Sequence, residues 1–296
     1  MEIKNVTVIG AGTMGNGIAQ VFAMHAFNVT LCDISNEALE RALKTIRTNL
    51  DRMVNKGLVS QENAELTVGR VSISTDTSRA VASADLVVEA ATENFELKKK
   101  IFSQIDKATH PNCILATNTS SISITSLAAA TSDPSRVIGM HFMNPVPVMK
   151  LVEIIRGYST SDHACKVVMD LSKSMGKEPV EVNDYPGFVA NRILMPMINE
   201  AVYTLYEGVA GVREIDTVMK LGMAHPMGPL ALADFIGLDV CVSILNIMQA
   251  GLGNQKYAPC PLLVNMVNAG KLGKKSGEGF YVYQEGSKEA DVSPRL

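Results

Sequence analysis

The amino-acid sequence predicts an α/β fold, with a doubly wound sheet in the first part of the chain and an all-helical C-terminal domain after it. Over the first two thirds of the chain, short apolar strands alternate with helical patterns. Continuous apolar strands separated by helices are typical of a parallel sheet that is covered on both faces. A glycine-rich turn follows the first strand, and the strand patterns end near residue 184.

The expected strands are short runs rich in β-branched residues. In chain order they cover residues 3–9, 28–33, 71–74, 86–88, 113–116 and 136–141. Two later strands, 150–156 and 178–182, flank a helix that begins near Asp162. Helical patterns separate most of these strands, as a parallel sheet requires.

The length of the chain also favours two domains. At 296 residues it is near the size at which one hydrophobic core divides into two. Pro186 and Gly187 predict a hinge, because Pro restricts the backbone and Gly relaxes it. We expect residues 1–184 to form the sheet domain and residues 185–296 the helical domain. Helices are expected over residues 188–207, 212–221 and 238–250, with a polar tail after Tyr283.

Composition excludes several classes of function. The chain has 27 basic and 30 acidic side chains and a net charge of −3, which argues against a nucleic-acid-binding protein. No apolar run approaches the ~18 residues that cross a bilayer, so we expect a cytoplasmic protein without a membrane contact. Five dispersed cysteines without a CxxC pair are typical of buried thiols in a reducing compartment. We therefore expect no metal site.

The glycine-rich turn is typical of a Rossmann-type dinucleotide site. Its residues are Gly10, Ala11, Gly12, Thr13, Met14 and Gly15. The first glycine permits the turn, the second lets the backbone approach a pyrophosphate, and the third lets helix and strand pack closely. The amides at the start of the following helix favour phosphate binding.

Asp33 ends the second expected strand, at roughly the ~20-residue spacing of a carboxylate that binds ribose hydroxyls. Such a carboxylate would repel a 2′-phosphate, so the sequence favours NAD over NADP. The motif by itself leaves FAD open.

Three polar residues predict a catalytic site. Ser120 follows one expected strand, His141 ends another, and Glu153 lies inside an apolar strand where a carboxylate needs a partner. Ligands bind beyond the carboxyl ends of parallel strands. A Glu bonded to one nitrogen of His141 would fix its tautomer and raise the basicity of the other nitrogen. Oxidation of an alcohol by NAD requires such a base.

A series of motifs closely resembles the short-chain 3-hydroxyacyl-CoA dehydrogenases over nearly the whole chain. The motifs lie at residues 10–15, 89–94, 117–121, 141–153, 184–192 and 273–281. The resemblance implies reversible, NAD-linked conversion of (S)-3-hydroxyacyl-CoA to 3-oxoacyl-CoA, with short acyl chains such as 3-hydroxybutyryl and acetoacetyl. It also implies that the helical domain closes the substrate cleft and forms a homodimer. The apolar helices of this domain exceed what a region of about 110 residues needs for its own core, which favours a buried interface between subunits.

The resemblance also implies roles for single residues. His141 is the catalytic acid and base, with Glu153 as its orienting partner, and Ser120 and Asn191 contact the region of the substrate's 3-oxygen. The positions that match cofactor contacts are Glu93, Lys98, Ser120, Asn144 and Lys275. On the CoA side the matches are Lys56, Ser120 and Asn49, where Asn49 replaces the serine of the family pattern. As a run of charge, residues 98–100 are more typical of a solvated helix face.

Two other functions fit parts of the sequence. One is a dehydrogenase of free hydroxy acids that acts without CoA. The other is a non-catalytic NAD-binding protein like the lens crystallins of this superfamily, which would not need His141 and Glu153 intact. All four candidate catalytic residues are present here.

Overall fold

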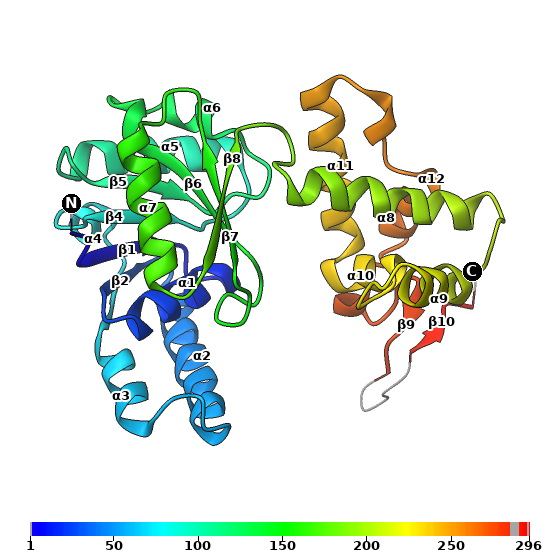
Figure 1. Cartoon of the computed structure of the whole chain (residues 1–296), viewed down its shortest axis with the longest axis horizontal. Coiled ribbons are helices and arrows are strands. Elements are labelled where there is room, and N and C mark those ends of the chain that lie inside the picture. Colours follow the sequence, from blue (N-terminus) through cyan, green and yellow to red (C-terminus); the bar gives the residue numbers. More distant parts are fainter. Residues whose placement is uncertain (1, 285–289, 295) are drawn as a thin grey trace. The chain divides into compact units, whose positions relative to one another are not determined.

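The computed structural model describes residues 2–284, 290–294 and 296. These residues form two compact units, of which the first ends at Tyr185 and the second begins at Pro186. Figure 1 shows the helices and strands of each unit.

The first unit contains an eight-stranded sheet in the order β3-β2-β1-β4-β5-β6-β7-β8. The strands are β1 Asn5–Ile9, β2 Asn28–Cys32, β3 Val71–Ser74, β4 Leu86–Glu89, β5 Ile114–Thr117, β6 Val137–Phe142, β7 Leu151–Arg156 and β8 Glu178–Asn183. All neighbours are parallel except β6 and β7. The predicted doubly wound α/β fold is confirmed, with strands at the expected places.

The sheet is mostly parallel, and β7 and β8 run antiparallel to the other six strands. Only residues 143–150 connect β6 to β7. Parallel neighbours require a crossover of a dozen or more residues, so a connection this short brings the chain back antiparallel.

Seven α-helices and one 3₁₀ turn accompany this sheet in the described residues of the first unit. They are α1 Thr13–Met24, α2 Asn36–Asn55, α3 Gln61–Gly69, α4 Thr77–Val81, α5 Phe95–Ala108, α6 Ile124–Ala128, η1 Pro134–Arg136 and α7 Asp162–Ser174. Leu86, Val87 and Val88 of β4 are all buried although successive side chains point to opposite faces. The sheet is therefore covered on both faces, as the unbroken apolar strands predict.

The second unit is mainly helical, as predicted. It consists of α8 Ala190–Tyr206, α9 Val212–Gly222, α10 Pro229–Ile236, α11 Leu238–Leu252, η2 Gln255–Tyr257, α12 Pro261–Asn268, η3 Lys274–Ser276, β9 Tyr281–Val282 and β10 Asp291–Val292. It has its own apolar core, built around Ile198, Leu230 and Leu245. Part of the polar tail expected after Tyr283 is ordered, because β10 pairs antiparallel with β9 and Ser293 is buried. Residues 285–289 and 295 of that tail lie outside the described residues.

Among the described residues, no single helix combines the length and apolar character of a membrane span. Taken together, α10 and α11 would pass on length and composition, but the two are bent by 95° at their junction.

Candidate active site

The glycine-rich turn brings the start of α1 very close to the end of β1. Gly10 has a positive φ of 101°, in the region that favours glycine. A Cβ on Gly15 would lie 1.7 Å from the carbonyl oxygen of Gly10, whereas a Cβ on Gly12 would meet no atom within 4 Å. Gly15 therefore permits the close contact between helix and turn, and Gly12 presents its backbone to open space.

The first turn of α1 is suited to an anion. Gly12 is the N-cap, so no side chain accepts a hydrogen bond from the first amides of the helix. Helices α2, α3 and α5 each have a polar N-cap side chain that does so. Uncapped amides together with the helix dipole favour a phosphate group.

Asp33 lies directly after β2 and beside the glycine-rich turn. Its Oδ2 accepts a hydrogen bond of 2.7 Å from the Ala11 amide, and its Oδ1 accepts one of 3.0 Å from the Ser35 amide. Asp33 and Ala11, together with Gly12 and Thr13, line a cavity of about 690 Å³. That volume is in the range of small-molecule and cofactor sites. An open glycine turn, an uncapped helix and an acidic residue in one cavity fit the diphosphate and ribose of NAD.

His141 and Glu153 form a buried pair across β6 and β7. The antiparallel register places the two residues directly opposite each other. Nδ1 of His141 lies 2.8 Å from Oε2 of Glu153, and the residues are only 9% and 3% exposed. The contact assigns Nδ1 to the carboxylate, so Nε2 is the nitrogen through which the ring can exchange a proton with a substrate. The cross-strand pair thus provides an oriented acid and base.

Asn118 links this pair to the neighbouring loop. It follows β5, and its Oδ1 accepts a hydrogen bond of 2.9 Å from the Phe142 amide, at the residue after His141. No role was predicted for Asn118 from the sequence. An amide side chain directly after a buried strand was the available signal.

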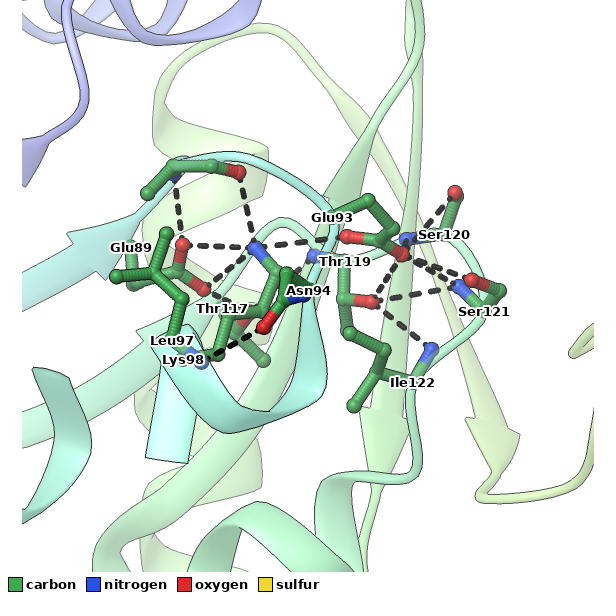
Figure 2. A network of polar contacts seen from close by, with 11 residues as sticks. Glu89, Glu93, Asn94, Leu97, Lys98, Thr117, Thr119, Ser120, Ser121 and Ile122 are labelled. Carbon is green, nitrogen blue, oxygen red and sulfur yellow. Dashed lines mark hydrogen bonds and ion pairs between the residues drawn. The ribbon is translucent and has the colours of Figure 1, made fainter. Parts of the chain in front are cut away.

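The loop after β5 carries Ser120, which is half-buried. Figure 2 shows that several polar groups of this loop form hydrogen bonds with the Glu93 carboxylate. Its Oε1 accepts hydrogen bonds from the amides of Ser120 and Ser121 at 3.0 and 3.1 Å. It also accepts hydrogen bonds from the hydroxyls of Thr119 at 2.5 Å and Ser121 at 2.9 Å. Glu93 thereby holds the conformation of the segment that presents Ser120.

Glu93 remains ionised in this setting. Burial acts to raise its pKa, but the charge of Lys98 and the hydrogen bonds from Thr119, Ser121 and Ser120 outweigh burial, so the pKa lies below its ordinary value.

Lys98 lies inside the protein rather than on a solvated face. Its side chain has no exposed surface, and Nζ lies 2.7 Å from Oε1 of Glu89, also fully buried. The solvated helix face expected for residues 98–100 is therefore wrong for Lys98, while Lys99 and Lys100 are exposed. No role was predicted for Glu89 from the sequence, although a carboxylate at the end of an apolar strand is a visible signal.

The remaining predicted positions of the first unit are dispersed. Asn144 is exposed in the connection after β6, at a cis Asn144–Pro145 bond. Lys56 is the exposed C-cap of α2. Asn49 is half-buried on α2, and its Nδ2 donates a hydrogen bond of 3.2 Å to Oε1 of the buried Gln20 on α1. Asn49 thus joins two helices of its own unit.

Two predicted site residues belong to the second unit. Asn191 is buried in the first turn of α8. Lys275 lies in η3, and its Nζ forms an ion pair with Asp239 at 2.6 Å.

The five cysteines are buried and unpaired. Burial raises the pKa of the Cys113 and Cys241 thiols to about 12, which disfavours the reactive thiolate. Within the described ranges, no three His, Cys, Asp or Glu side chains gather in the manner of a metal site.

Comparisons with known proteins agree over both units. Residues 5–185 match the NAD binding domain of 3-hydroxyacyl-CoA dehydrogenase, and residues 187–283 match the C-terminal domain of the same family. A Bacillus subtilis protein named "Probable 3-hydroxybutyryl-CoA dehydrogenase" is 56% identical over 285 residues, which are 96% of this chain and 99% of the relative. The mitochondrial hydroxyacyl-coenzyme A dehydrogenase of Rattus norvegicus is 44% identical, covering 95% of this chain and 92% of the relative.

A solved structure shows the same similarity. The crystal structure of (S)-3-hydroxybutyryl-CoA dehydrogenase PaaH1 from Ralstonia eutropha superimposes with a TM-score of 0.93 at 50% identity, covering 96% of this chain and all of that one.

Proposed function

Because this chain belongs to the 3-hydroxyacyl-CoA dehydrogenase family, we propose that it interconverts (S)-3-hydroxyacyl-CoA and 3-oxoacyl-CoA with NAD, using 3-hydroxybutyryl-CoA and acetoacetyl-CoA as its short-chain pair. The observation that carries the proposal is the buried pair of His141 and Glu153 in a unit that also contains the open glycine turn. The first supplies an acid and base, and the second fits a dinucleotide.

In the oxidative direction, Nε2 of His141 accepts the proton of the substrate's 3-hydroxyl. Glu153 holds Nδ1–H, fixes the tautomer and stabilises the imidazolium that forms. Bound NAD supplies the hydride acceptor. In the reverse direction the same imidazolium returns the proton to the 3-oxygen.

Ser120 and Asn191 are proposed to contact that oxygen. A hydroxyl and an amide can donate hydrogen bonds to an oxygen that becomes negative as a ketone is reduced. The hydrogen bond from the Ser120 amide to Glu93 supports a defined position for this residue. Lys56 is proposed to bind a CoA phosphate by charge, with Asn49 as its neighbour on α2.

We propose further that the enzyme is cytoplasmic and works as a homodimer through its helical unit. That unit exposes several large apolar side chains, including Val218, Leu221 and Phe235. Large exposed apolar side chains favour an interface between subunits.

Reduction of acetoacetyl-CoA, followed at the nicotinamide absorbance with NADH and separately with NADPH, tests the proposal. His141→Gln should lower kcat by about 10²- to 10⁴-fold because it removes the acid and base. Glu153→Gln should lower kcat by about tenfold or more with little change in NADH affinity, because an amide can donate to Nδ1 and so favour the wrong tautomer.

Each part of the proposal has its own contrary outcome. A wild type that does not reduce acetoacetyl-CoA contradicts the proposed substrate. A His141→Gln variant with nearly full turnover excludes His141 as the acid and base. Faster reaction with NADPH than with NADH contradicts the role given to Asp33.

The same assay separates the two alternatives. A dehydrogenase of free hydroxy acids would reduce acetoacetate as fast as acetoacetyl-CoA. A non-catalytic protein would bind NADH and turn over neither. The intact pair of His141 and Glu153 favours catalysis over both binding alone and a mechanism that uses lysine for proton transfer.

A further inference from the structure

The ion pair between Glu89 and Lys98 is fully enclosed in the first unit. Nζ of Lys98 lies 2.7 and 2.9 Å from the two carboxylate oxygens of Glu89 and 3.1 Å from the carbonyl oxygen of Ala91. Glu89 also accepts hydrogen bonds from the Ala91 amide at 2.7 Å and the Thr117 hydroxyl at 2.6 Å. The pair is thus well satisfied, and it joins the end of β4 to the end of β5 and the start of α5.

Stability alone does not account for this pair. Removing two charges from water is costly, and well-packed apolar side chains of similar volume often stabilise a fold as well or better. The arrangement has another consequence, because Nζ of Lys98 also lies 3.4 Å from Oε2 of Glu93. The side chain of Glu93 is 35% exposed. The contact between Lys98 and Glu93 therefore connects the buried ion pair to the edge of the site.

The two oxygens of Glu93 serve different neighbours. Oε2 faces Lys98, and Oε1 accepts two consecutive amides, those of Ser120 and Ser121 (Figure 2). Two adjacent amides can converge on one oxygen only in a restricted backbone conformation. The orientation of the carboxylate, and with it the conformation of the loop, therefore depends on the cation behind it.

We propose that Glu89 and Lys98 are positioning residues of the dehydrogenase reaction, which act through Glu93 to hold the Ser120 loop in the conformation that presents Ser120 to the substrate oxygen. The inference rests on the proposed function. Lys98 is fully buried, and the inference adds a positioning task to the cofactor contact that the resemblance implies for this residue. It also assigns a task to Glu89.

The test is the paired variant Glu89→Gln/Lys98→Met in the full-length enzyme. Removing both charges avoids an unpaired buried ion, so the fold should be retained. We expect kcat for acetoacetyl-CoA reduction to fall by about tenfold to a hundredfold through misplacement of the loop. The rates are measured at saturating NADH, and the affinity for NADH is determined separately by its fluorescence, so that a change in cofactor binding is distinguished from the fall in kcat.

The pH profile supplies a readout that a merely structural role would not move. Without Lys98 the pKa of Glu93 should rise, because burial is then opposed only by hydrogen bonds. The rate of the paired variant should therefore fall more steeply than that of the wild type as the pH is lowered. Adding Glu93→Gln to the paired variant should abolish this additional acid limb.

Lys99→Met is the matched control, since Lys99 is the exposed neighbour on the same helix. It should keep the wild-type rate and pH profile. If the paired variant behaves like Lys99→Met, the positioning role is wrong. It is equally wrong if NADH affinity is lost while kcat is retained, since Lys98 would then serve cofactor binding.

Two further outcomes keep the inference separate from folding and from the proposed function. If the paired variant does not fold, the single variant Glu93→Gln tests the inference, because it leaves the buried pair in place. It should lower kcat about tenfold. A full rate in this variant would overturn the inference. A wild type inactive on acetoacetyl-CoA overturns the proposed function and this inference together, whereas an active wild type with an unimpaired paired variant overturns only the inference.

Discussion

Glu153, Glu89 and Asp234 are buried carboxylates, and their partners give them different properties. Glu153 meets the ring of His141, and Glu89 meets the ammonium group of Lys98. Asp234 lies in the second unit, where it accepts hydrogen bonds from the amides of Phe280 and Tyr281. For Asp234 it is hydrogen bonds, and not an adjacent cation, that oppose the effect of burial on its pKa.

Asp234 provides a prediction about pH. Burial raises its pKa to about 6, although hydrogen bonds from Phe280, Tyr281 and Tyr283 oppose the increase. The folded protein then binds a proton more tightly than the unfolded chain, in which the ordinary value is 3.8. The contribution of Asp234 to stability is therefore present below about pH 4 and is lost as the pH rises through about 6.

We expect the free energy of unfolding of the wild type, relative to Asp234→Asn, to decrease by about 1–3 kcal/mol between pH 4 and 7. Urea unfolding across this range measures the difference. Asp170→Asn, at a largely exposed carboxylate on α7, is the control and should show a much smaller pH dependence. A difference between wild type and Asp234→Asn that stays constant with pH would contradict the raised pKa.

At the scale of elements, two connections shape the site. The short return from β6 to β7 sets the antiparallel register that brings His141 opposite Glu153. The tight passage from β1 into α1 exposes the uncapped helix amides beside Asp33. Both features depend on how closely one element follows another.

Gly15 and Gly12 test the second connection separately. Gly15→Ala places a methyl group against the carbonyl of Gly10, so it should lower the free energy of unfolding by about 1–3 kcal/mol or more. Gly12→Ala has room in the fold and should change stability by less than about 0.5 kcal/mol. Its methyl group occupies the space proposed for the diphosphate, so NADH should bind about tenfold more weakly.

Chemical denaturation and NADH titration of the two purified variants measure these effects. Equal destabilisation by both substitutions would show that the open space at Gly12 is needed for folding. Unchanged NADH affinity in Gly12→Ala would place the diphosphate elsewhere.

The whole molecule consists of two units with separate cores, and the helical unit is proposed to pair with a second copy. Val218 and Leu221 lie three residues apart on α9 and are 60% and 81% exposed. Residues at this spacing share one face of a helix. They form an apolar patch where introduced charge should oppose association.

Val218→Lys/Leu221→Lys should therefore shift the protein from dimer to monomer at micromolar concentration, as measured by light scattering after size-exclusion chromatography. Leu58→Lys is the control, because Leu58 is 67% exposed in the first unit and lies outside the proposed interface. A dimer that survives the double substitution would exclude this face of α9, and a monomeric wild type would refute the proposed homodimer.

Much of the fold and of the cofactor site follows from local patterns. The strands, the glycine-rich turn and Asp33 were predictable because each depends on residues close in sequence and on their spacing. His141 and Glu153 were predicted as partners because an isolated carboxylate in an apolar strand is costly. Glu89 and Lys98 were not paired in advance, since nothing in a run of three lysines shows which one turns inward.

The sequence by itself determined the class of fold, the nucleotide turn and the residue types of the proposed chemistry, because local spacing and apolar periodicity specify them. Only the tertiary structure decided the antiparallel return of β7, the burial of Lys98 and the convergence of the Ser120 loop on Glu93. These features join residues from different strands and loops. Their geometry depends on packing and on the satisfaction of buried charge across the sheet, which no single segment of sequence contains.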